Sequence, residues 1–342
     1  MTRPAGQHEG QYHAARDQVG LVDRSDRALI EIMGADRTVW LNNLVTNVVK
    51  TLSSGEGIYA FAVNVKGRVV FDANVLMLDP PAQPDGRIWL DLDAGWLADA
   101  LKHLNRYIIT EKVQLADVTA RYDRLAILGP QAAALAQRLG LSNLIAMASL
   151  QHVPLQDGSG HVIRHDFAGV TGAEFIVPVD SADEWRARMM EAGREFGIDP
   201  IDASVVDTLR IEAGIPASRC DIDPETIPPE TGQIERGISY HKGCYLGQEV
   251  IERMRSHGII AKRLVGVRLE GETAPACPAA IKANDAESGR LTSVCWSYAL
   301  SAILGLGYLK SSHASAGLAV TVAGESGPIG GQVVALPVRP AA

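Results

Sequence analysis

A cysteine in a glycine-containing loop is the strongest chemical signal in the sequence. Cys244 lies in residues 241–249 (HKGCYLGQE), which lead into an expected helix that ends at Gly258. A thiol at or just before a helix N-terminus, beside Lys242, would have its thiolate stabilised by the helix dipole and by the cation. The alternative is a small buried cysteine that fills space in a turn, and the spacing alone favours that alternative.

A carboxylate lies inside an apolar run. Asp72 falls in the β-rich residues 69–78, and Asn74 follows two positions later, on the same face of the expected strand. A buried carboxylate lowers stability unless it is paired or functional. The alternative is a strand whose solvated face carries both polar side chains, and without further information this alternative is favoured.

Two more charged residues lie where a cleft could use them. Glu174 begins an apolar run after the glycine-containing residues 169–172 and can point into a cleft, although an exposed edge position is commoner. Arg210 follows Asp207 by three residues on an expected helix over 205–213. Charges with this spacing ordinarily form a solvated helix face.

The hydrophobic pattern predicts the elements that position these residues. Residues 29–33 form an expected strand, and residues 37–43 an expected helix with Val39, Trp40 and Leu44 on one face. Residues 58–65 and 69–78 are typical of a hairpin. Other expected strands are 88–92, 125–128, 162–165 and 174–178, and other expected helices are 96–107, 130–139, 183–196 and 205–213.

The pattern changes after residue 260. Short β-like runs (264–269, 289–296, 302–308, 319–322 and 331–336) alternate with glycine and proline turns and hold no helical period. This alternation predicts a small antiparallel β-barrel. The fold class is therefore α+β, with a body of two α+β lobes over residues 20–260 and a C-terminal barrel domain over residues 261–338.

Composition narrows the class of protein. The chain has 342 residues, of which 46% are hydrophobic and 21% charged, as in globular proteins. A net charge of −8 argues against a protein that coats nucleic acid. The four cysteines are far apart without a C-x-x-C pair, which suits a reducing compartment and gives no metal signature. Without an apolar leader or a membrane-length apolar run, we expect a cytoplasmic protein.

Four segments resemble the aminomethyltransferase (glycine-cleavage T-protein) family. They are residues 55–72, 171–178 (TGAEFIVP), 207–214 (DTLRIEAG) and 242–249 (KGCYLGQE). The last segment is similar to the K-G-C-Y-x-G-Q-E signature of the YgfZ branch of that family, and the resemblance extends from about residue 20 to residue 335. The motif residues are Lys242, Gly243, Cys244, Tyr245, Gly247, Gln248 and Glu249.

The resemblance implies three lobes around a central channel for tetrahydrofolate or a one-carbon-substituted folate. Asp72 matches an Asp implied to act at the N5/N10 end, Glu174 a Glu implied to grip the pterin edge, and Tyr59 a Tyr that lines the pocket. Arg210 completes the implied folate-binding set. A carboxylate can accept two adjacent pterin N–H groups at once, which makes such a contact strong.

The chain also departs from the family pattern. Phe71 replaces the first Asp of an Asp-Asp pair, and we expect this to make the site more apolar. Residues 23–27 (DRSDR) replace a Ser-His-Met segment, and the segment before Glu174 is shortened. These changes weaken the case for transfer from a lipoyl-bound aminomethyl group and leave folate binding largely intact.

Three functions follow as hypotheses. The first is a YgfZ-type protein that binds tetrahydrofolate and supports iron–sulfur cluster assembly or repair through Cys244, with an iron–sulfur protein or an assembly factor as partner. The second is a folate-dependent aminomethyl or one-carbon transferase that uses Asp72. The third is an RNA or protein adaptor that uses a basic stripe, and the net charge makes nucleic acid an unfavoured partner. The stripe comprises Arg253, Arg255, His257, Lys262 and Arg263.

Overall fold

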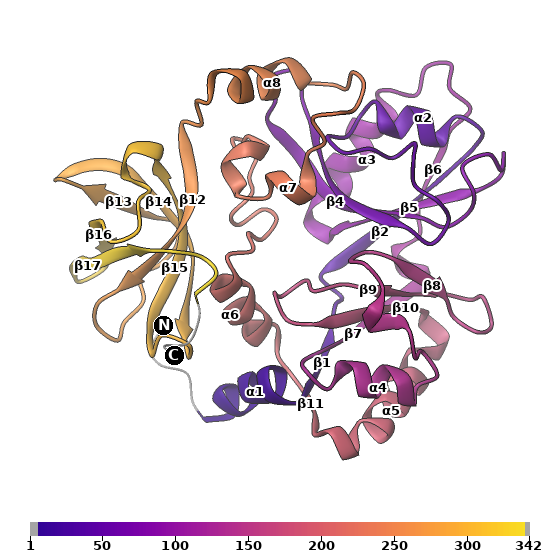
Figure 1. Ribbon diagram of the computed structural model, residues 1–342, viewed down its shortest axis with the longest axis horizontal. Helices are drawn as coiled ribbons and strands as arrows, with labels where there is room; N and C mark the ends of the chain where they lie inside the picture. Colours follow the sequence, from indigo (N-terminus) through magenta and orange to yellow (C-terminus); the bar gives the residue numbers. More distant parts are fainter. Residues whose placement is uncertain (1–5, 339–342) are drawn as a thin grey trace.

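Two sheets and a closed barrel form the framework of the protein. The computed structural model describes residues 6–338. Figure 1 shows the barrel at the left, the first sheet at the upper right and the second sheet at the lower right, with α6 between the barrel and the sheets. The α+β body followed by an antiparallel barrel confirms the predicted fold class.

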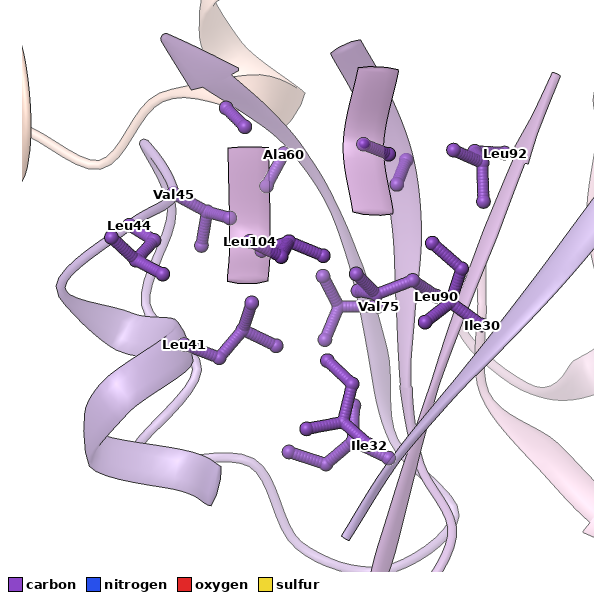
Figure 2. Packing of buried hydrophobic residues seen from close by; sticks show 14 of the residues in the cluster. Ile30, Ile32, Leu41, Leu44, Val45, Ala60, Val75, Leu90, Leu92 and Leu104 are labelled. Carbon is purple, nitrogen blue, oxygen red and sulfur yellow. The ribbon is translucent and has the colours of Figure 1, made fainter. Parts of the chain in front are cut away.

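The first sheet is antiparallel and has five strands. Their order is β3 (Gly57–Val63), β4 (Val69–Met77), β5 (Arg87–Asp93), β2 (Arg27–Met33) and β6 (Gln114–Asp117). One face packs against α2 (Arg37–Asn42) and α3 (Leu97–Asn105), and Figure 2 shows the aliphatic side chains that fill this layer. Within the cluster, Ile30, Val75 and Leu90 from the sheet meet Leu41 from α2 and Leu104 from α3.

The other face of the first sheet turns toward the second sheet. Because side chains alternate along a strand, Asp72 and Asn74 on β4 lie on this face with Asp91 on β5. Asn74 lies directly opposite Tyr59 on β3 and Asp91 on β5. The apolar neighbours on this face include Trp89, and they pack against the second sheet.

The second sheet has six strands. Their order is β11 (Ile198–Pro200), β1 (Val19–Asp23), β7 (Tyr122–Leu128), β10 (Gly172–Pro178), β9 (His161–Arg164) and β8 (His152–Pro154). Its pairings are antiparallel except for that between β1 and β11. Its outer face is covered by α4 (Ala132–Arg138) and α5 (Ala182–Ala192). The chain passes from β1 to β2 through residues 24–26, where the two sheets meet.

The barrel closes through pairing of its first and last strands. Its strand order is β12 (Lys262–Leu269), β15 (Ala302–Lys310), β14 (Ala286–Ser297), β13 (Ala279–Ala283), β16 (Ala319–Gly324) and β17 (Gly327–Val334). Inward side chains such as Val267, Ile281 and Leu291 fill the interior. Closure leaves no free edge along which another chain could pair.

Helix α6 (Ala203–Ala213) joins the body to the barrel. Leu209 packs with α1 (Gly6–Asp17) and the second sheet, whereas Ile211 packs against barrel strands β14 and β15. The helix ends at Gly214, whose φ of 73° is the left-handed conformation expected of a glycine C-cap. The remaining helices are α7 (Ile234–Gly237) and α8 (Gln248–His257).

Several local expectations were wrong. Val39 is 63% exposed, so it does not share the buried face of α2 with Trp40, because adjacent residues on a helix point about 100° apart, and Leu44 lies beyond the end of the helix. The pattern also missed α1, whose residues are mostly polar. It missed α7 and the short strands β1, β6, β8, β11 and β13 because their lengths give too few periods to detect. Within residues 6–338, no helix combines the length and apolarity needed to cross a membrane.

Candidate functional site

A pocket of about 520 Å³ lies where the two sheets meet α6. Its wall is formed by the β1–β2 connection, the inter-sheet face of β3 and β4, the segment between β9 and β10, the first two turns of α6, the loop after α6 (residues 215–218), and α7. The wall is rich in ionisable side chains of both signs. These are Asp23, Arg24, Asp26, Arg27, Tyr59, Asp72, Asp93, His165, Asp207, Arg210 and Arg236.

Asp72 is held by two hydroxyl groups at the pocket wall. Tyr59 Oη donates to Oδ2 at 2.8 Å, and Ser218 Oγ donates to Oδ1 at 2.7 Å. The side chain is 7% exposed, and Asn74 beside it is 4% exposed. The solvated face favoured for these two residues is therefore wrong, because this side of β4 is covered by the second sheet and by the loop after α6.

The position of Phe71 corrects the expectation that this residue makes the site more apolar. It lies on the opposite face of β4 from Asp72, is fully buried, and packs in the layer under α3, with its ring 6.2 Å from that of His103. Period-two alternation places adjacent residues on opposite faces. The replacement of a carboxylate by Phe71 therefore changes the core of the first lobe and leaves the polarity of the pocket unchanged.

Tyr59 connects Asp72 to a cation at the rim. The Arg236 guanidinium lies 4.1 Å from the centroid of the Tyr59 ring. Burial, with the nearby Asp72 carboxylate, holds the pKa of Tyr59 well above its usual value. Tyr59 is therefore a hydrogen-bond donor throughout the physiological pH range, and it fixes the orientation of the Asp72 carboxylate.

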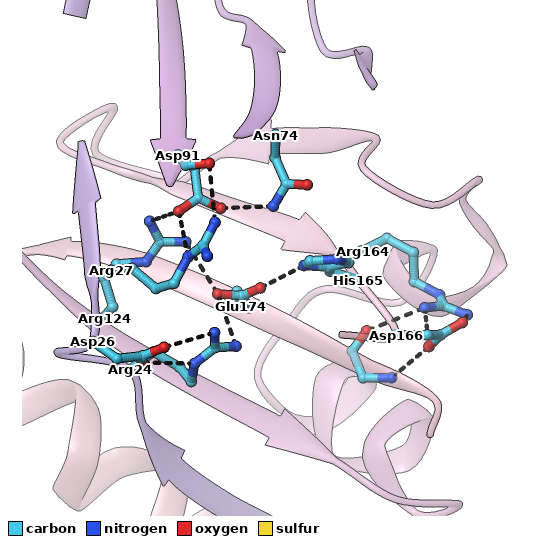
Figure 3. Close-up of polar contacts among 11 residues, drawn as sticks. Arg24, Asp26, Arg27, Asn74, Asp91, Arg124, Arg164, His165, Asp166 and Glu174 are labelled. Atoms are coloured by element: carbon cyan, nitrogen blue, oxygen red, sulfur yellow. Dashed lines mark hydrogen bonds and ion pairs between the residues drawn. The ribbon is translucent and has the colours of Figure 1, made fainter. Parts of the chain in front are cut away.

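A charge network closes the bottom of the pocket. We use this name for Arg24, Asp26, Arg27, Asp91, Arg124, His165 and Glu174, most of which Figure 3 shows joined by dashed contacts.

Arg124 on β7 joins the two sheets within the charge network. Its guanidinium reaches Asp91 on β5 at 2.7 Å and Glu174 on β10 at 3.0 Å. Arg27 also binds Asp91, at 2.9 Å, and Asn74 donates to the second oxygen of that carboxylate at 2.8 Å. Burial raises the pKa of Asp91, but the two guanidinium groups outweigh it, and the pKa lies below its ordinary value.

Glu174 is an interior residue. It is 1% exposed, so the commoner expectation of an exposed edge position was wrong, since both faces of β10 are covered. Its Oε1 accepts from His165 Nδ1 at 2.5 Å, and Arg24 approaches Oε2 at 3.7 Å. Burial opposes ionisation, yet Arg24, His165 and Arg124 together hold the pKa of Glu174 well below its usual range. Glu174 itself is not part of the pocket wall, whereas His165 is.

Arg210 is also buried, at 7% exposure, which corrects the expectation of a solvated helix face. It donates to Asp207 at 2.6 Å, to Asp221 at 2.6 Å and to Ser293 at 2.9 Å. Asp221 is fully buried and accepts from the barrel residues Thr292 and Ser293 and from the backbone N–H of residue 217. We call this set the Arg210–Asp221 clamp. It fixes the loop that carries Ser218, and through Ser218 it supports Asp72.

The cysteine loop, residues 241–249, lies apart from the pocket: none of its residues is in the pocket wall described above. Lys242 is 9% exposed and donates to three backbone oxygens, those of Asn42, Val45 and Asn47, at 2.6, 2.6 and 2.8 Å. Its ammonium group therefore anchors the loop to the segment that follows α2.

The other motif residues continue this anchoring. Tyr245 is buried, and its N–H donates to Gln248 Oε1 at 3.3 Å. Gly247 has φ of 76°, and a Cβ there would lie 2.3 Å from the backbone oxygen of Asn64, so only glycine fits. Cys244 is exposed, three residues before the N-cap of α8. The loop thus presents the thiol to solvent while its neighbours hold the backbone.

The basic stripe lies on and just after α8. Arg253, Arg255 and His257 are exposed. Arg255 is 3.4 Å from Glu252, and the half-buried Lys262 is 3.5 Å from Glu230. Local acidic partners therefore neutralise part of the stripe, and none of its residues is in the pocket wall.

Several wall residues were absent from the predicted site. Arg24 and Arg27 belong to the segment that departs from the family pattern, and the arginines themselves were the available signal. His165 and Ser218 gave no signal in the sequence, since one is the last residue of an expected strand and the other follows a helix by several residues. Within residues 6–338, no group of three or more His, Cys, Asp or Glu side chains is arranged to hold a metal ion.

Two family models cover most of the chain. The GCVT N-terminal domain matches residues 5–240, and the glycine cleavage T-protein C-terminal barrel domain matches residues 262–338.

Similar proteins and structures agree with these matches. An aminomethyltransferase of Halothermothrix orenii is 29% identical over 332 residues, which cover 96% of this chain and 90% of the relative. One from a Thermoanaerobacter species is 26% identical over 93% of this chain and 86% of its own. The crystal structure of glycine cleavage system aminomethyltransferase T from Bartonella henselae has the same fold, with a TM-score of 0.86 at 20% identity, over 97% of this chain and 89% of that one. The chain therefore belongs to the glycine cleavage T-protein family, with both its GCVT N-terminal domain and its C-terminal barrel.

Proposed function

We propose that this protein is a folate-dependent aminomethyl or one-carbon transferase, with tetrahydrofolate in the pocket and Asp72 at the reacting end. The observation that carries the proposal is the Asp72 carboxylate itself, which lies in the pocket wall with one oxygen fixed by Tyr59 and the other by Ser218. The full-length similarity to aminomethyltransferases supports the same class of reaction.

The pocket fits a pterin-sized heterocycle with a charged tail. Its volume of about 520 Å³ lies in the range of small-molecule sites. Phe167 and Tyr59 offer aromatic surfaces, and Asn74 and His165 offer polar groups to a ring edge. Arg236 is exposed at the rim, where a cation suits the carboxylates of a glutamate tail.

Asp72 is the wall residue with a chemical task at the reacting end of the folate. Tetrahydrofolate supplies ring and side-chain nitrogens that accept a one-carbon unit. Asp72 accepts a hydrogen bond from an amine at that end and can hold its proton, since Tyr59 and Ser218 leave lone pairs on both oxygens. Burial of the wall keeps water from competing for that carboxylate.

The test is turnover of tetrahydrofolate with glycine-cleavage components or with an N-methyl amine as donor. Removal of a general acid–base group ordinarily lowers the rate by about 100-fold or more, and we expect such a loss in Asp72→Ala. The matched control is Asp85→Ala, in an exposed loop outside the pocket, which should leave the rate unchanged. Absence of turnover by the unmodified protein with every donor of these classes would contradict the proposal.

A second candidate function rests on the cysteine loop. We infer that Cys244 supports iron–sulfur cluster assembly or repair, as in the YgfZ branch, with a partner protein that supplies further ligands. The supporting observation is that Lys242, Tyr245 and Gly247 anchor the loop while Cys244 stays exposed. One thiol cannot hold a cluster, so the remaining ligands have to come from a second chain or a small thiol.

The second candidate is tested by complementation. In cells that lack their own YgfZ-type protein, we expect Cys244→Ala to abolish the recovery of iron–sulfur enzyme activity. Because the side chain is exposed, the same variant should change the free energy of unfolding by less than about 0.5 kcal/mol and leave tetrahydrofolate binding intact. Full complementation by Cys244→Ala would exclude this role.

A further inference from the structure

The carboxylate implied to grip a pterin edge is already occupied. Glu174 Oε1 accepts from His165 Nδ1 at 2.5 Å, and Oε2 accepts from Arg124 at 3.0 Å. The side chain is 1% exposed and lies behind the pocket wall, not in it. His165 and Arg24 both lie against Glu174, and both line the pocket.

Release of Glu174 toward the pocket would disturb buried charges. Arg124 is 4% exposed and depends on Glu174 and Asp91 for its two ion pairs. Removal of one partner from a buried ion pair strongly destabilises a protein, because it leaves an uncompensated charge. Glu174 is therefore held in place by the same network that joins the two sheets (Figure 3).

The hydrogen bond to Glu174 fixes the histidine tautomer. An ionised carboxylate only accepts hydrogen bonds, so Nδ1 of His165 carries a proton, and a ring protonated at Nδ1 alone has Nε2 as an acceptor. Among the described residues, no hydrogen bond engages Nε2, although the residue lines the pocket. The ring is kept in place by Phe167, with ring centroids 5.9 Å apart, and Arg24 packs over Phe167 at 4.2 Å.

We propose that His165 Nε2 is the group that accepts an N–H from the occupant of the pocket, and that Glu174 is a positioning residue that acts through His165. The ligand class is a heterocycle that offers a ring or amino N–H at this side and an amine at Asp72. The inference rests on the proposed function, for which tetrahydrofolate is the probe. In this inference His165 contacts the pterin edge, whereas the family resemblance implies that Glu174 does.

Two substitutions distinguish the roles of the two ring nitrogens of His165. His165→Asn keeps an amide near Nδ1 that can donate to Glu174 but has no atom at the Nε2 position, whereas His165→Gln extends an amide toward the Nε2 position. We expect His165→Asn to weaken tetrahydrofolate binding by roughly 10-fold, the value of about one hydrogen bond, and His165→Gln to weaken it less than about 3-fold. His313→Gln, in the barrel, is the matched control and should leave the affinity unchanged.

Nitrogen NMR of the imidazole gives a readout that a purely structural role would not move. In the free protein we expect a protonated Nδ1 and a bare Nε2 for His165, with a shift of the Nε2 signal on saturation with tetrahydrofolate and no change in His313. The reverse tautomer, or saturation without a shift at Nε2, would overturn the inference.

The outcomes also distinguish this inference from the proposed function. Unchanged affinity in His165→Asn together with lost affinity in Glu174→Gln would mean that Glu174 contacts the ligand directly, and only the role of His165 would fall. Absence of tetrahydrofolate binding by the unmodified protein, measured by calorimetry, would overturn both.

Discussion

The interface between the two sheets has two chemically opposite halves, and two residues on β5 mark them. Asp91 belongs to the half beside the pocket, where Asp91 and Glu174 each meet at least one guanidinium group. Trp89, two residues earlier on the same face, belongs to the other half, where its ring lies 5.2 Å from that of His161, which in turn lies 5.2 Å from that of His152.

The second half contains two buried histidines. His152 is 3% exposed and His161 8% exposed, and within the described chain both ring nitrogens of His152 and Nδ1 of His161 have no hydrogen-bond partner. Burial lowers the pKa of each histidine to about 4, with a further contribution from His161 for His152 and from Arg87 for His161. The first half therefore holds its buried charges in ion pairs, whereas the two histidines of the second half are buried as neutral rings at neutral pH.

The largest expected effect comes from breaking the charged half. Arg124→Met leaves Asp91 and Glu174 buried with fewer partners, and we expect the free energy of unfolding to fall by about 3–5 kcal/mol. Urea denaturation measures the change. The exposed pair between Arg186 and Asp23, at 2.9 Å, is the control, since Arg186→Met should cost less than about 1 kcal/mol. Equal effects of the two variants would mean that the buried ion pairs of Arg124 contribute no more to stability than an exposed ion pair.

Mild acid should act on the neutral half first. The unfolded histidines have pKa values near 6.5, above the folded value of about 4, so the unfolded chain binds protons first as the pH falls. The stabilisation is complete above pH 6.5 and declines toward pH 4, by on the order of 2 kcal/mol per histidine at pH 5.

Two variants test whether the buried histidines cause this acid sensitivity. His161→Phe keeps an aromatic ring beside Trp89 and should flatten the pH dependence of unfolding between pH 6.5 and 5, whereas His257→Gln, at an exposed position on α8, should not. An unchanged pH profile in His161→Phe would mean that the charged half, and not the histidine pair, controls the acid response.

The smallest expected effect tests a single donor in the charged half. Tyr59→Phe leaves Asp72 Oδ2 without its hydroxyl partner, and we expect a loss of about 1 kcal/mol in the free energy of unfolding. Tyr245→Phe is the matched control, because the buried Tyr245 hydroxyl has no partner within the described residues. That variant should be neutral or slightly stabilising, and a larger loss in Tyr245→Phe than in Tyr59→Phe would contradict this account.

The sequence predicted the elements with the clearest periods. The β3–β4 hairpin, the barrel and α6 with its Gly214 cap follow from alternation and from glycine placement, and they are confirmed. The division of the chain into a body over residues 20–260 and a barrel domain over residues 261–338 stays a prediction. Short strands such as β13 gave too little pattern to detect.

Side-chain environments were harder to predict than elements. Asp72, Glu174 and Arg210 each had a commoner exposed alternative, and in each case the structure buries the side chain. Their burial depends on partners distant in the sequence, such as Ser218 for Asp72 and Asp221 for Arg210, which no local pattern reveals. The role of Phe71 was misjudged for a simpler reason, since alternation alone places it on the opposite face from Asp72.

The Arg210–Asp221 clamp bears on how parts of this family can be exchanged. Thr292 and Ser293 are the barrel's contribution to the clamp, and they lie on β14, outside the pocket wall. A chimera that receives a relative's barrel with apolar residues at these positions would leave the Asp221 carboxylate short of donors and loosen the Ser218 loop. The barrel can thus be exchanged between family members only together with those two hydroxyl groups, and recombination is constrained at residues that lie outside the pocket wall.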